Sequence, residues 1–251
     1  KYETGETIGS VGDASFFSFG RDKIVSSVFG GVGSINKKHT NAVSRFISLH
    51  NQLAFPDTRW VVQQIFHPLA FAVILPLYRI GVGKILLSML QKISLLSFPV
   101  YPEEKEGKRP GDFPKKYPNA LASMILPQLE KLERYNASRI EIASYYAQVL
   151  GKVYSAPGIV PGAVYLRYPI LSFKRDEYIK RAKSSGIILG NWYSNILDPK
   201  GTDFKNLYFQ KSLHPRSGDS ASKIINLPTR ISFAQAKKVV AAAEADQQQF
   251  G

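Results

Sequence analysis

Hydrophobic and polar positions predict short strands and a helix in the first part of the chain. Residues 7–12 are punctuated by glycine and are typical of tight turns, and residues 14–19 are the small and aromatic residues of a buried strand. Residues 32–36 predict a second strand after a glycine pair. Residues 39–53 then repeat apolar side chains at helical spacing, which predicts an amphipathic helix.

Residues 58–102 have a different composition from the rest of the chain. The segment contains no Asp or Glu, and its basic residues are Arg59, Arg79, Lys84 and Lys92. Its first half, residues 60–78, is strongly apolar, but polar residues and two prolines interrupt the apolar run. These interruptions make it a poor candidate for a continuous membrane span.

The second half of this segment predicts a basic amphipathic helix. Lysine, serine and glutamine recur on one face, and the opposite face is apolar, with Leu86, Leu87, Leu90 and Ile93. Such a helix fits an interfacial membrane contact through residues 60–97. It fits equally well a helical hairpin that packs on the protein or on a partner subunit. Amphipathicity does not separate the two, and both remain open.

The remainder of the chain predicts a polar loop, a long helix and a small α/β domain. Residues 103–118 are rich in helix breakers, and a long helix starts at Asn119, with a kink expected at Pro127. Strand and helix then alternate, with strands expected at 163–173 and 186–192 and helices at 175–185 and 233–247. Ser232 and Gln235 form a capping box at the start of the last helix.

Composition narrows the class of protein. At 251 residues with 44% hydrophobic residues, the chain can form one large domain or two smaller ones with a proper core. It has no cysteine, which fits a reducing, cytoplasmic setting, and its four histidines lack the spacing of metal ligands. The net charge of +14 favours anionic partners, yet zinc-finger, RNP and KH patterns are missing, so we expect no nucleic acid and no metal.

The start of the chain, Lys1-Tyr2-Glu3, has no initiator Met and no basic stretch followed by an apolar run. We therefore expect no signal peptide, and we expect the sequence to begin inside a domain.

One lysine has a distinctive setting. Lys23 follows the strand at residues 14–19 and precedes the turn at Gly30 and Gly31. A lysine attacks an aldehyde only when its amine is neutral, and burial or a nearby cation such as Arg21 favours the neutral form. On the residues alone, however, a lysine at the end of a strand is more often a solvated charge.

The segment around this lysine resembles the cofactor-lysine segment of the sugar aminotransferase family called DegT/DnrJ/StrS. That segment reads Gly-x-x-Gly-Asp, a small apolar strand, Ser-Phe, three residues, Lys, and then a Gly-Gly turn. The matching residues here are Gly9, Gly12, Asp13, Ser18, Phe19, Lys23, Gly30 and Gly31. The resemblance implies that Lys23 is the Schiff-base lysine for pyridoxal 5'-phosphate (PLP) and that Ser18 contacts the cofactor phosphate.

Later segments support the same resemblance. Residues 120–132, followed by Arg139 and Tyr146, are similar to the Ala-Ala…Gln-Leu-x-x-Leu…Arg…Tyr helix of the family, and residues 226–228 to its late Leu-Pro turn. Several positions depart from the pattern, among them a glycine and a three-residue loop, and the later histidines of the family, near Tyr165 and after Tyr193, have no counterparts. Gly20 stands where many members have His, and Pro114-Lys115-Lys116 aligns with an Asn-Tyr-Arg loop that reaches the phosphate of the neighbouring subunit.

The resemblance implies an α/β protein of the PLP-transferase fold type I, which is aspartate aminotransferase-like. Residues 1–57 would be the C-terminal end of the large cofactor-binding domain, residues 58–118 a helical insertion and loop, and residues 119–251 the long helix with the small domain. The family's other cofactor contacts would precede Lys1, so we expect residues 1–251 alone to be inactive.

The implied function is transamination of a nucleotide-linked keto sugar in the biosynthesis of cell-surface polysaccharide or amino sugars. A lysine at position 23 favours this reaction over sugar dehydration, because dehydrating members tend to carry His there. Glutamate would be the amino donor, and a homodimer in the cytoplasm would be the working form. The alternatives are a degenerate, non-catalytic member and a membrane-surface protein that binds through residues 60–97 at the inner face of the membrane.

Overall fold

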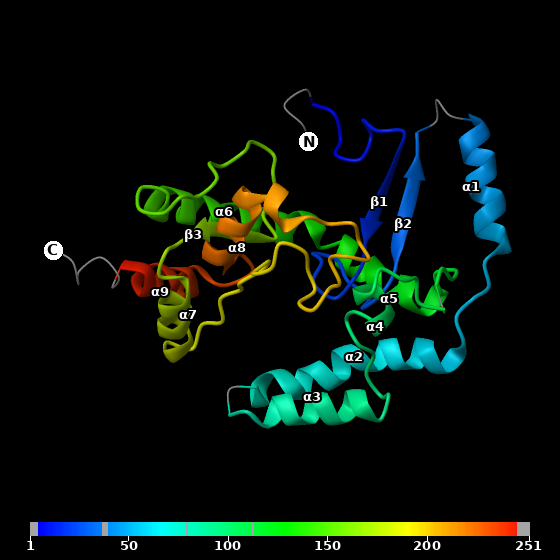
Figure 1. Cartoon of the computed structure of the whole chain (residues 1–251), viewed down its shortest axis with the longest axis horizontal. Helices are drawn as coiled ribbons and strands as arrows, with labels where there is room; N and C mark the ends of the chain where they lie inside the picture. Colours follow the sequence, from blue (N-terminus) through cyan, green and yellow to red (C-terminus); the bar gives the residue numbers. More distant parts are fainter. Residues whose placement is uncertain (1–4, 37–39, 79, 112, 245–251) are drawn as a thin grey trace. The chain divides into compact units, whose positions relative to one another are not determined.

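The computed structural model describes residues 5–36, 40–78, 80–111 and 113–244. The chain forms two compact units, one of residues 1–101 and 109–132 and the other of residues 102–108 and 133–251. The first unit contains β1 (Ala14–Ser18), β2 (Gly31–Ile35), α1 (Thr40–Gln52), α2 (Thr58–Leu77), α3 (Val82–Lys92) and α5 (Asn119–Leu129) (Figure 1). The second contains α4 (Pro102–Lys105), nearly all of α6 (Leu132–Leu150), β3 (Arg167–Leu171), α7 (Arg175–Ser184), η1 (Lys211–Leu213), α8 (Pro215–Lys223), β4 (Ile224–Pro228) and α9 (Phe233–Glu244).

Strands β1 and β2 form an antiparallel pair, with Ala14 opposite Ile35 and Ser18 opposite Gly31. Both predicted strands are thus confirmed, but the first one is not buried. Phe16 is 87% exposed and Phe17 43%. The prediction of a buried strand was wrong for this chain because a two-stranded ribbon has no second layer to cover both of its faces.

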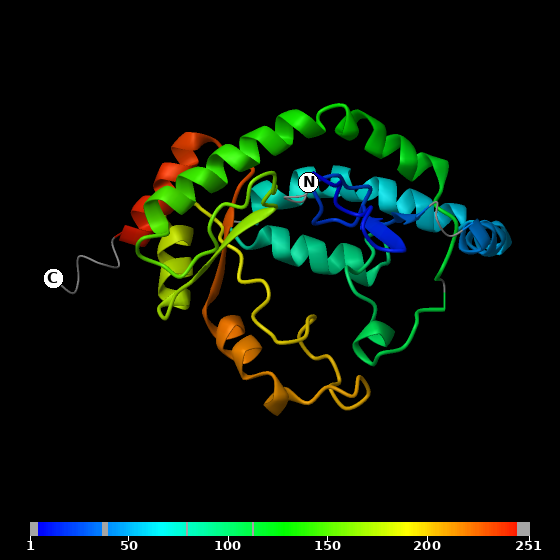
Figure 2. The ribbon, with the colours of Figure 1, turned by 90° about the horizontal axis from the view of Figure 1, so that it is seen from above.

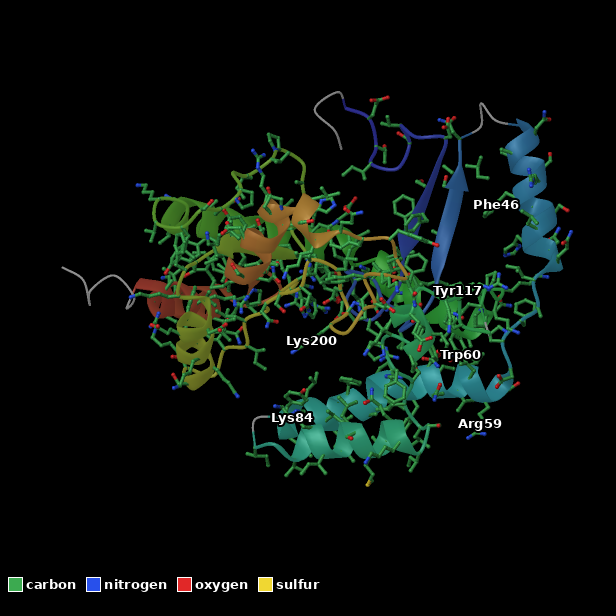
Figure 3. The ribbon with its side chains drawn as sticks, viewed as in Figure 1. Phe46, Arg59, Trp60, Lys84, Tyr117 and Lys200 are labelled. Carbon is green, nitrogen blue, oxygen red and sulfur yellow. The ribbon has the colours of Figure 1, made fainter. Side chains whose placement is uncertain are left out.

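Helix α1 confirms the helix predicted after β2, except that His39 lies outside the described residues. Its apolar side chains lie largely at the surface, and Phe46 is 42% exposed. The Phe46 ring faces β2 (Figure 3), where a Cβ added to Gly33 would lie 3.0 Å from the ring. The small residue on β2 therefore lets the ring of α1 come close to the strand.

Helices α2 and α3 form an antiparallel hairpin, in which they lie side by side in both views (Figures 1 and 2). Ala70, Ile74 and Leu96 form its core, against which Leu86, Leu87 and Leu90 pack. A Cβ on Gly83 would lie 2.4 Å from the carbonyl oxygen of Ile74, so only glycine permits this close approach. The structure therefore shows the helical hairpin, which was one of the two possibilities left open by the sequence. The other possibility, a membrane contact, stays a prediction.

Helix α2 continues through Pro68 and Pro76 without a break. Asp57 caps its start, since the Asp57 carboxylate accepts a hydrogen bond of 2.8 Å from the Trp60 amide. By length and composition alone, α2 could cross a membrane, with a mean hydropathy of 1.5 over its most apolar window, and it is the one such helix among the described residues. The prolines therefore interrupt the helix less than the sequence suggests.

The predicted polar loop at residues 103–118 contains one helical turn, α4, which the sequence analysis missed. Glu103 and Glu104 lie in its first turn, where carboxylates favour a helix N-terminus. The long helix expected from Asn119 divides into α5 and α6, with Glu130 and Lys131 between them. Pro127 lies inside α5, which continues to Leu129, and the kink expected at Pro127 stays a prediction.

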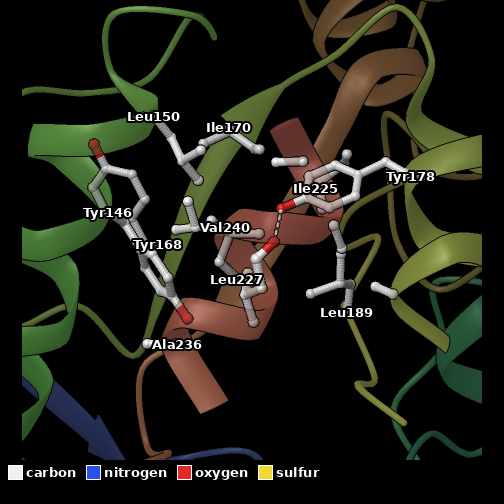
Figure 4. Packing of buried hydrophobic residues seen from close by; sticks show 14 of the residues in the cluster. Tyr146, Leu150, Tyr168, Ile170, Tyr178, Leu189, Ile225, Leu227, Ala236 and Val240 are labelled. Carbon is white, nitrogen blue, oxygen red and sulfur yellow. Dashed lines mark hydrogen bonds between the residues drawn. The ribbon is translucent and has the colours of Figure 1, made fainter. Parts of the chain in front are cut away.

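The second unit is built around the antiparallel pair β3–β4, in which Tyr168 lies opposite Leu227. Figure 4 shows its core, where side chains of α6, α7 and α9 pack around the two strands. The Tyr178 hydroxyl, fully buried there, donates a hydrogen bond of 2.9 Å to the Val239 carbonyl. A buried tyrosine is tolerated because its hydroxyl has this partner.

Two predictions for the second unit were wrong. Residues 186–192 form only a single bridge, from Gly190 to Asn226, because the chain turns away after one pair of hydrogen bonds. The segment Asn226-Leu227-Pro228, expected as a turn, lies in strand β4, where its amide and carbonyl groups pair with β3. The strand expected at residues 163–173 is confirmed over β3 only.

The capping box before α9 is confirmed. The Ser232 hydroxyl accepts from the Gln235 amide at 3.3 Å, and the Gln235 side chain accepts from the Ser232 amide at 3.0 Å. The predicted end of this helix at Gln247 lies outside the described residues. The division into residues 1–57, 58–118 and 119–251 stays a prediction, since compact packing does not tell which segment was inserted.

Candidate active site

Lys23 lies on the loop of residues 19–30 that joins β1 to β2. Three backbone hydrogen bonds shape this loop. The Phe19 amide donates to the Gly30 carbonyl at 2.9 Å, the Ser27 amide to the Phe19 carbonyl at 3.0 Å, and the Lys23 amide to the Gly20 carbonyl at 3.1 Å. The structure therefore places the lysine where the sequence predicts it, between a strand and a glycine turn.

The Lys23 side chain is exposed, whereas Val25 and Val28 carry the buried apolar surface of the loop. This exposure agrees with the solvated lysine that the residues alone favour, because the short strands and their loop place no layer over the side chain. What the loop offers is an accessible primary amine on a backbone held by hydrogen bonds.

Ser18 is the last residue of β1, and Gly20 connects it to the lysine turn. The Ser18 hydroxyl oxygen accepts from the Gly20 amide at 3.2 Å, while the Gly20 carbonyl accepts from the Lys23 amide. Because this contact uses the hydroxyl as an acceptor, its proton stays available for another acceptor. An exposed hydroxyl donor at the end of β1 and an amine on the following loop suit a ligand that carries a phosphate and an aldehyde.

Gln128 of α5 anchors the far side of the loop. Its side-chain amide donates to the Ser26 carbonyl at 2.8 Å, and its side-chain carbonyl accepts from the Ser26 amide at 3.1 Å. The same side-chain nitrogen also contacts the carbonyl of Met124 at 2.7 Å, one turn earlier in the helix. A rigid helix thus fixes the backbone three residues after Lys23.

Tyr117 holds the end of the loop. Its hydroxyl is hydrogen-bonded to the hydroxyl of the fully buried Ser27, and burial raises the pKa of Tyr117. Gly30 has φ +114°, and a Cβ there would lie 2.1 Å from the Tyr117 ring. Val28 has φ 75°, an unfavourable value for a β-branched residue. Such a backbone persists only where its surroundings fix it.

An aromatic cluster lies beside the loop and joins it to α2. Its four rings belong to Phe29, Trp60, Tyr101 and Phe113, with centroids 5.6 to 6.3 Å apart in the contacting pairs. Figure 3 shows Trp60 and Arg59 on opposite sides of α2, with Trp60 toward Tyr117. The apolar contacts of the cluster tie the lysine loop to the helical hairpin.

A buried polar cluster completes this attachment. Arg21 donates to the Ser97 hydroxyl at 2.6 Å and to the Phe98 carbonyl at 3.2 Å. His67 Nε2 accepts from the Ser97 amide at 3.0 Å, and the Ser97 hydroxyl donates to the Gln64 side chain at 2.7 Å. Because these groups lie at the inner face of α2, they fix the hairpin relative to the loop.

Burial sets the electrostatics of this cluster. Desolvation, followed by the charge of Arg21, lowers the pKa of His67 to about 4. Burial also lowers the pKa of Arg21 to about 10, against the raising effect of Tyr101 and Asp22. His67 is therefore neutral at physiological pH, while the Arg21 guanidinium remains charged.

An open groove of about 540 Å³ lies between the loop and the hairpin. Arg21, Asp22 and Ser26 line its end near the lysine, and Phe71, Leu75 and Leu87 are among the helical residues that line the rest. The lysine loop thus borders a mainly apolar recess. Lys115 and Lys116, aligned with the family's phosphate-reaching loop, are half-buried, and the Lys116 amide donates to the Ala54 carbonyl at 2.9 Å.

Two motif residues of α6, Arg139 and Tyr146, have structural roles in the second unit. Arg139 is buried and donates to the Leu166 carbonyl and the Thr229 hydroxyl, both at 2.9 Å. Burial, followed by the charges of Arg230 and Arg167, lowers its pKa. The Tyr146 hydroxyl donates to the Pro228 carbonyl at 3.1 Å. Both side chains join α6 to the β-strand pair.

Sequence reasoning missed the anchors of the lysine loop. Gln128 was predicted only as part of a helix motif. No anchoring role was predicted for Tyr117, Ser97 or His67. The one signal in the sequence was the polar character of Gln128 within an apolar helix. The partners of these residues lie 102, 90, 76 and 46 positions away and leave no local pattern.

Comparison with solved structures defines the fold. The chain matches Spr1654 from Streptococcus pneumoniae in its PLP-form with a TM-score of 0.62 and 15% identity, over 98% of this chain and 54% of that one. CalS13, a sugar aminotransferase from Micromonospora echinospora, matches with 0.58 and 12%, over 95% and 53%. A DegT DnrJ EryC1 StrS aminotransferase from Brucella abortus matches with 0.56 and 17%, over 95% and 52%.

These likenesses confirm the predicted fold, which is that of the C-terminal part of fold type I PLP-dependent aminotransferases. The sequence model of the DegT/DnrJ/EryC1/StrS aminotransferase family matches residues 103–244, which is more than half of the chain. The chain belongs to this family. No curated protein matches it significantly.

The chain spans about half the length of the solved structures that it matches. The family match begins at residue 103, so Ser18, Lys23 and the α2–α3 hairpin lie outside it. The roles of Ser18 and Lys23 therefore stay predictions, now with a defined position on the loop between β1 and β2.

Proposed function

We propose that the protein is a PLP-dependent aminotransferase of keto sugars in which Lys23 is the Schiff-base lysine. Membership in the aminotransferase family carries this proposal. The position of Lys23 supports it, because the loop that bears the lysine is held at Ser26 by the motif residue Gln128. The match to Spr1654 in PLP-form and PMP-form structures supports PLP as the cofactor.

The donors on this loop fit PLP. Lys23 offers an exposed amine, and Ser18 an exposed hydroxyl whose oxygen already accepts from the Gly20 amide. The cofactor's aldehyde requires an amine and its phosphate requires hydrogen-bond donors. Ser18 and Lys23 are the residues of this chain that would hold it.

PLP, when bound, supplies an aldehyde carbon and an electron sink. The Lys23 amine must be neutral to bond to that carbon. Lys23 would hold the cofactor through its amine, and the same amine, when free, would act as the base and acid that moves a proton at the α-carbon of the amino donor. The loop hydrogen bonds hold the backbone on both sides of Lys23, at Gly20 and at Ser26.

The test is covalent trapping with borohydride. The protein, expressed with any residues that precede Lys1, is mixed with PLP and reduced, and the modified peptide is identified by mass spectrometry. We expect a visible absorbance band and a pyridoxyl group on Lys23. Lys23→Ala removes both, while Lys152→Ala, a change at an exposed lysine of the second unit, leaves them unchanged.

A band that persists unchanged in Lys23→Ala sinks the assignment of the lysine. A folded protein that neither binds PLP nor transaminates is the degenerate, non-catalytic member considered above. The two outcomes can be distinguished. The first shows that another residue supplies the reactive amine, and the second shows that the protein has no aminotransferase activity.

The finer parts of the proposal concern substrate and partners. We propose a nucleotide-linked keto sugar as acceptor, since a net charge of +14 favours an anionic substrate. Glutamate is the proposed donor, a homodimer the proposed assembly and polysaccharide or amino-sugar biosynthesis the proposed setting. Conversion of PLP to its amine form by single amino acids identifies the donor, and light scattering gives the assembly.

A further inference from the structure

The outer surface of the α2–α3 hairpin has no part in the proposed transamination. Helix α2 is apolar around most of its circumference. His67, Ala70 and Ile74 face inward and are buried. At 3.6 residues per turn, the opposite side carries a second apolar stripe. Its members are Val62, 57% exposed, Ile65, 38%, Leu69, 65%, and Val73, 56%.

Helix α3 carries a similar exposed stripe. Its members are Val82, 46% exposed, Ile85, 72%, Met89, 53%, and Ile93, 57%. Lys84, Ser88 and Lys92 are exposed on a neighbouring face of the same helix. Together with Ile93, the C-cap of α3, the hairpin exposes eight large apolar side chains, more than the single apolar residues that are normal at a protein surface.

The charge of the hairpin has a single sign. Residues 58–102 contain no carboxylate side chain, and Arg59, Lys84 and Lys92 are exposed. Figure 3 shows Arg59 and Lys84 near the two ends of α2. Exposed apolar stripes accompanied by cations and free of carboxylates match an anionic lipid surface, where headgroups attract lysine and arginine and acyl chains accept apolar side chains.

We propose that the α2–α3 hairpin docks the protein on an anionic lipid bilayer, with both helices lying in the plane of the interface. The stripes of α2 and α3 enter the boundary between headgroups and acyl chains, and Lys84, Lys92 and Arg59 contact lipid phosphates. This surface is separate from the Lys23 loop.

The inner face of α2 argues for docking and against crossing, although its length permits a span. Gln64 and His67 are buried there and bonded to Ser97, which in turn binds Arg21 of the lysine loop. Insertion of α2 across the bilayer would break this polar cluster and expose its groups to lipid, at a cost of several kcal/mol for each unsatisfied group. In-plane docking leaves every one of these hydrogen bonds in place.

Vesicle flotation tests the proposal on the protein expressed with any residues that precede Lys1. Vesicles of phosphatidylserine with phosphatidylcholine are compared with vesicles of phosphatidylcholine alone. We expect flotation with the anionic vesicles, release by high salt, and complete extraction by alkaline carbonate. Leu69→Glu combined with Val73→Glu should weaken binding at least ~10-fold, because burial of each leucine or valine side chain in the lipid strengthens binding by ~10-fold or more.

Lys84→Glu combined with Lys92→Glu should also weaken binding by about 10-fold or more, since each lost cation near the surface contributes roughly 5-fold. Matched controls in the second unit are Ile188→Glu, at a residue 68% exposed, and Lys152→Glu. Both controls should float like the unaltered protein. Circular dichroism and thermal unfolding establish that every variant is folded.

Four results would overturn the proposal. The unaltered protein could fail to float with anionic vesicles, or both hairpin variants could float as well as the controls. Alternatively, carbonate could leave the protein in the membrane, which would make α2 a span. If the hairpin variants instead convert a dimer to a monomer in the absence of lipid, the stripes cover a second copy of the chain. PLP trapping on Lys23 is measured without vesicles, so its outcome is independent of these results.

Discussion

Gln128 pairs with both backbone groups of Ser26, 102 residues earlier in the chain. Its side chain donates to the Ser26 carbonyl at 2.8 Å and accepts from the Ser26 amide at 3.1 Å. An amide side chain is the residue type that satisfies a peptide donor and acceptor together. This pair connects a motif in helix α5 to the loop that bears Lys23.

Replacing Gln128 should loosen that loop. In Gln128→Leu the donor and acceptor of Ser26 lose their partners, so we expect the free energy of unfolding to fall by about 1–3 kcal/mol. Urea unfolding measures the change, and limited proteolysis should show faster cleavage within residues 19–30. Gln52→Leu, at an exposed position on α1, serves as the control and should change stability little. Equal stability of the two variants would contradict the anchoring role.

A side chain at Gly30 should be poorly tolerated. Alanine would place its Cβ 2.1 Å from the Tyr117 ring and would adopt φ +114°. We expect Gly30→Ala to destabilise the protein by at least ~1–3 kcal/mol, the usual cost of a disfavoured backbone conformation. Gly158→Ala is the matched control, because its Cβ would meet nothing within 4 Å. The denaturation midpoints of both variants test this, and similar midpoints would show that Tyr117 moves aside freely.

His67 should make stability depend on pH. Its pKa in the folded protein is about 4, below the ordinary value of 6.5, because burial and then Arg21 oppose protonation. Between these pH values the unfolded chain binds more protons than the folded protein, so the free energy of unfolding rises with pH. The stabilisation is fully present above pH 6.5 and is lost as the pH falls to about 4.

The difference in stability between the unaltered protein and His67→Gln isolates this contribution from that of the carboxylates. We expect the difference to grow by up to about 3 kcal/mol from the acidic to the neutral end of that range. Glutamine can still accept from the Ser97 amide but does not titrate. His50→Gln, at an exposed position on α1, is the control. A difference that stays constant with pH would show that folding leaves the pKa of His67 unchanged.

Arg139 should be essential for the second unit. Its guanidinium donates to the Leu166 carbonyl and the Thr229 hydroxyl in a buried setting. Arg139→Ala removes both hydrogen bonds and leaves a cavity, so we expect a loss of about 2–4 kcal/mol. Arg134→Ala, at an exposed site on the same helix, should cost little. Chemical unfolding followed by fluorescence separates these results, and equal losses would exclude a packing role for Arg139.

Local pattern predicted the elements well where short-range contacts decide them. The hydrogen bonds of Ser232 with Gln235, for example, span only three residues. The strand expected at residues 186–192 does not form, because a strand depends on a pairing partner that is distant in the sequence. A strand needs a partner along its length, and Gly190 finds only one at Asn226.

The family and the place of the candidate lysine could also be predicted from the sequence. Ordered motifs identified the family, and the glycine pair after Lys23 predicted a turn into a strand, which is β2. The exposure of Lys23 and the anchors at Gln128 and Tyr117 could not be predicted, because they depend on segments about 100 residues apart in the chain.

Residues that lie close together in the chain were enough to identify the family, several of the helices and strands, and the absence of acidic residues from 58–102. These properties depend on residue types and near-neighbour spacing. Packing in three dimensions selects which apolar side chains of α2 are buried and which are exposed, because both sides of that helix are apolar in sequence. Folding also determines what holds the lysine loop, because it brings Gln128 to Ser26 and Ser97 to His67.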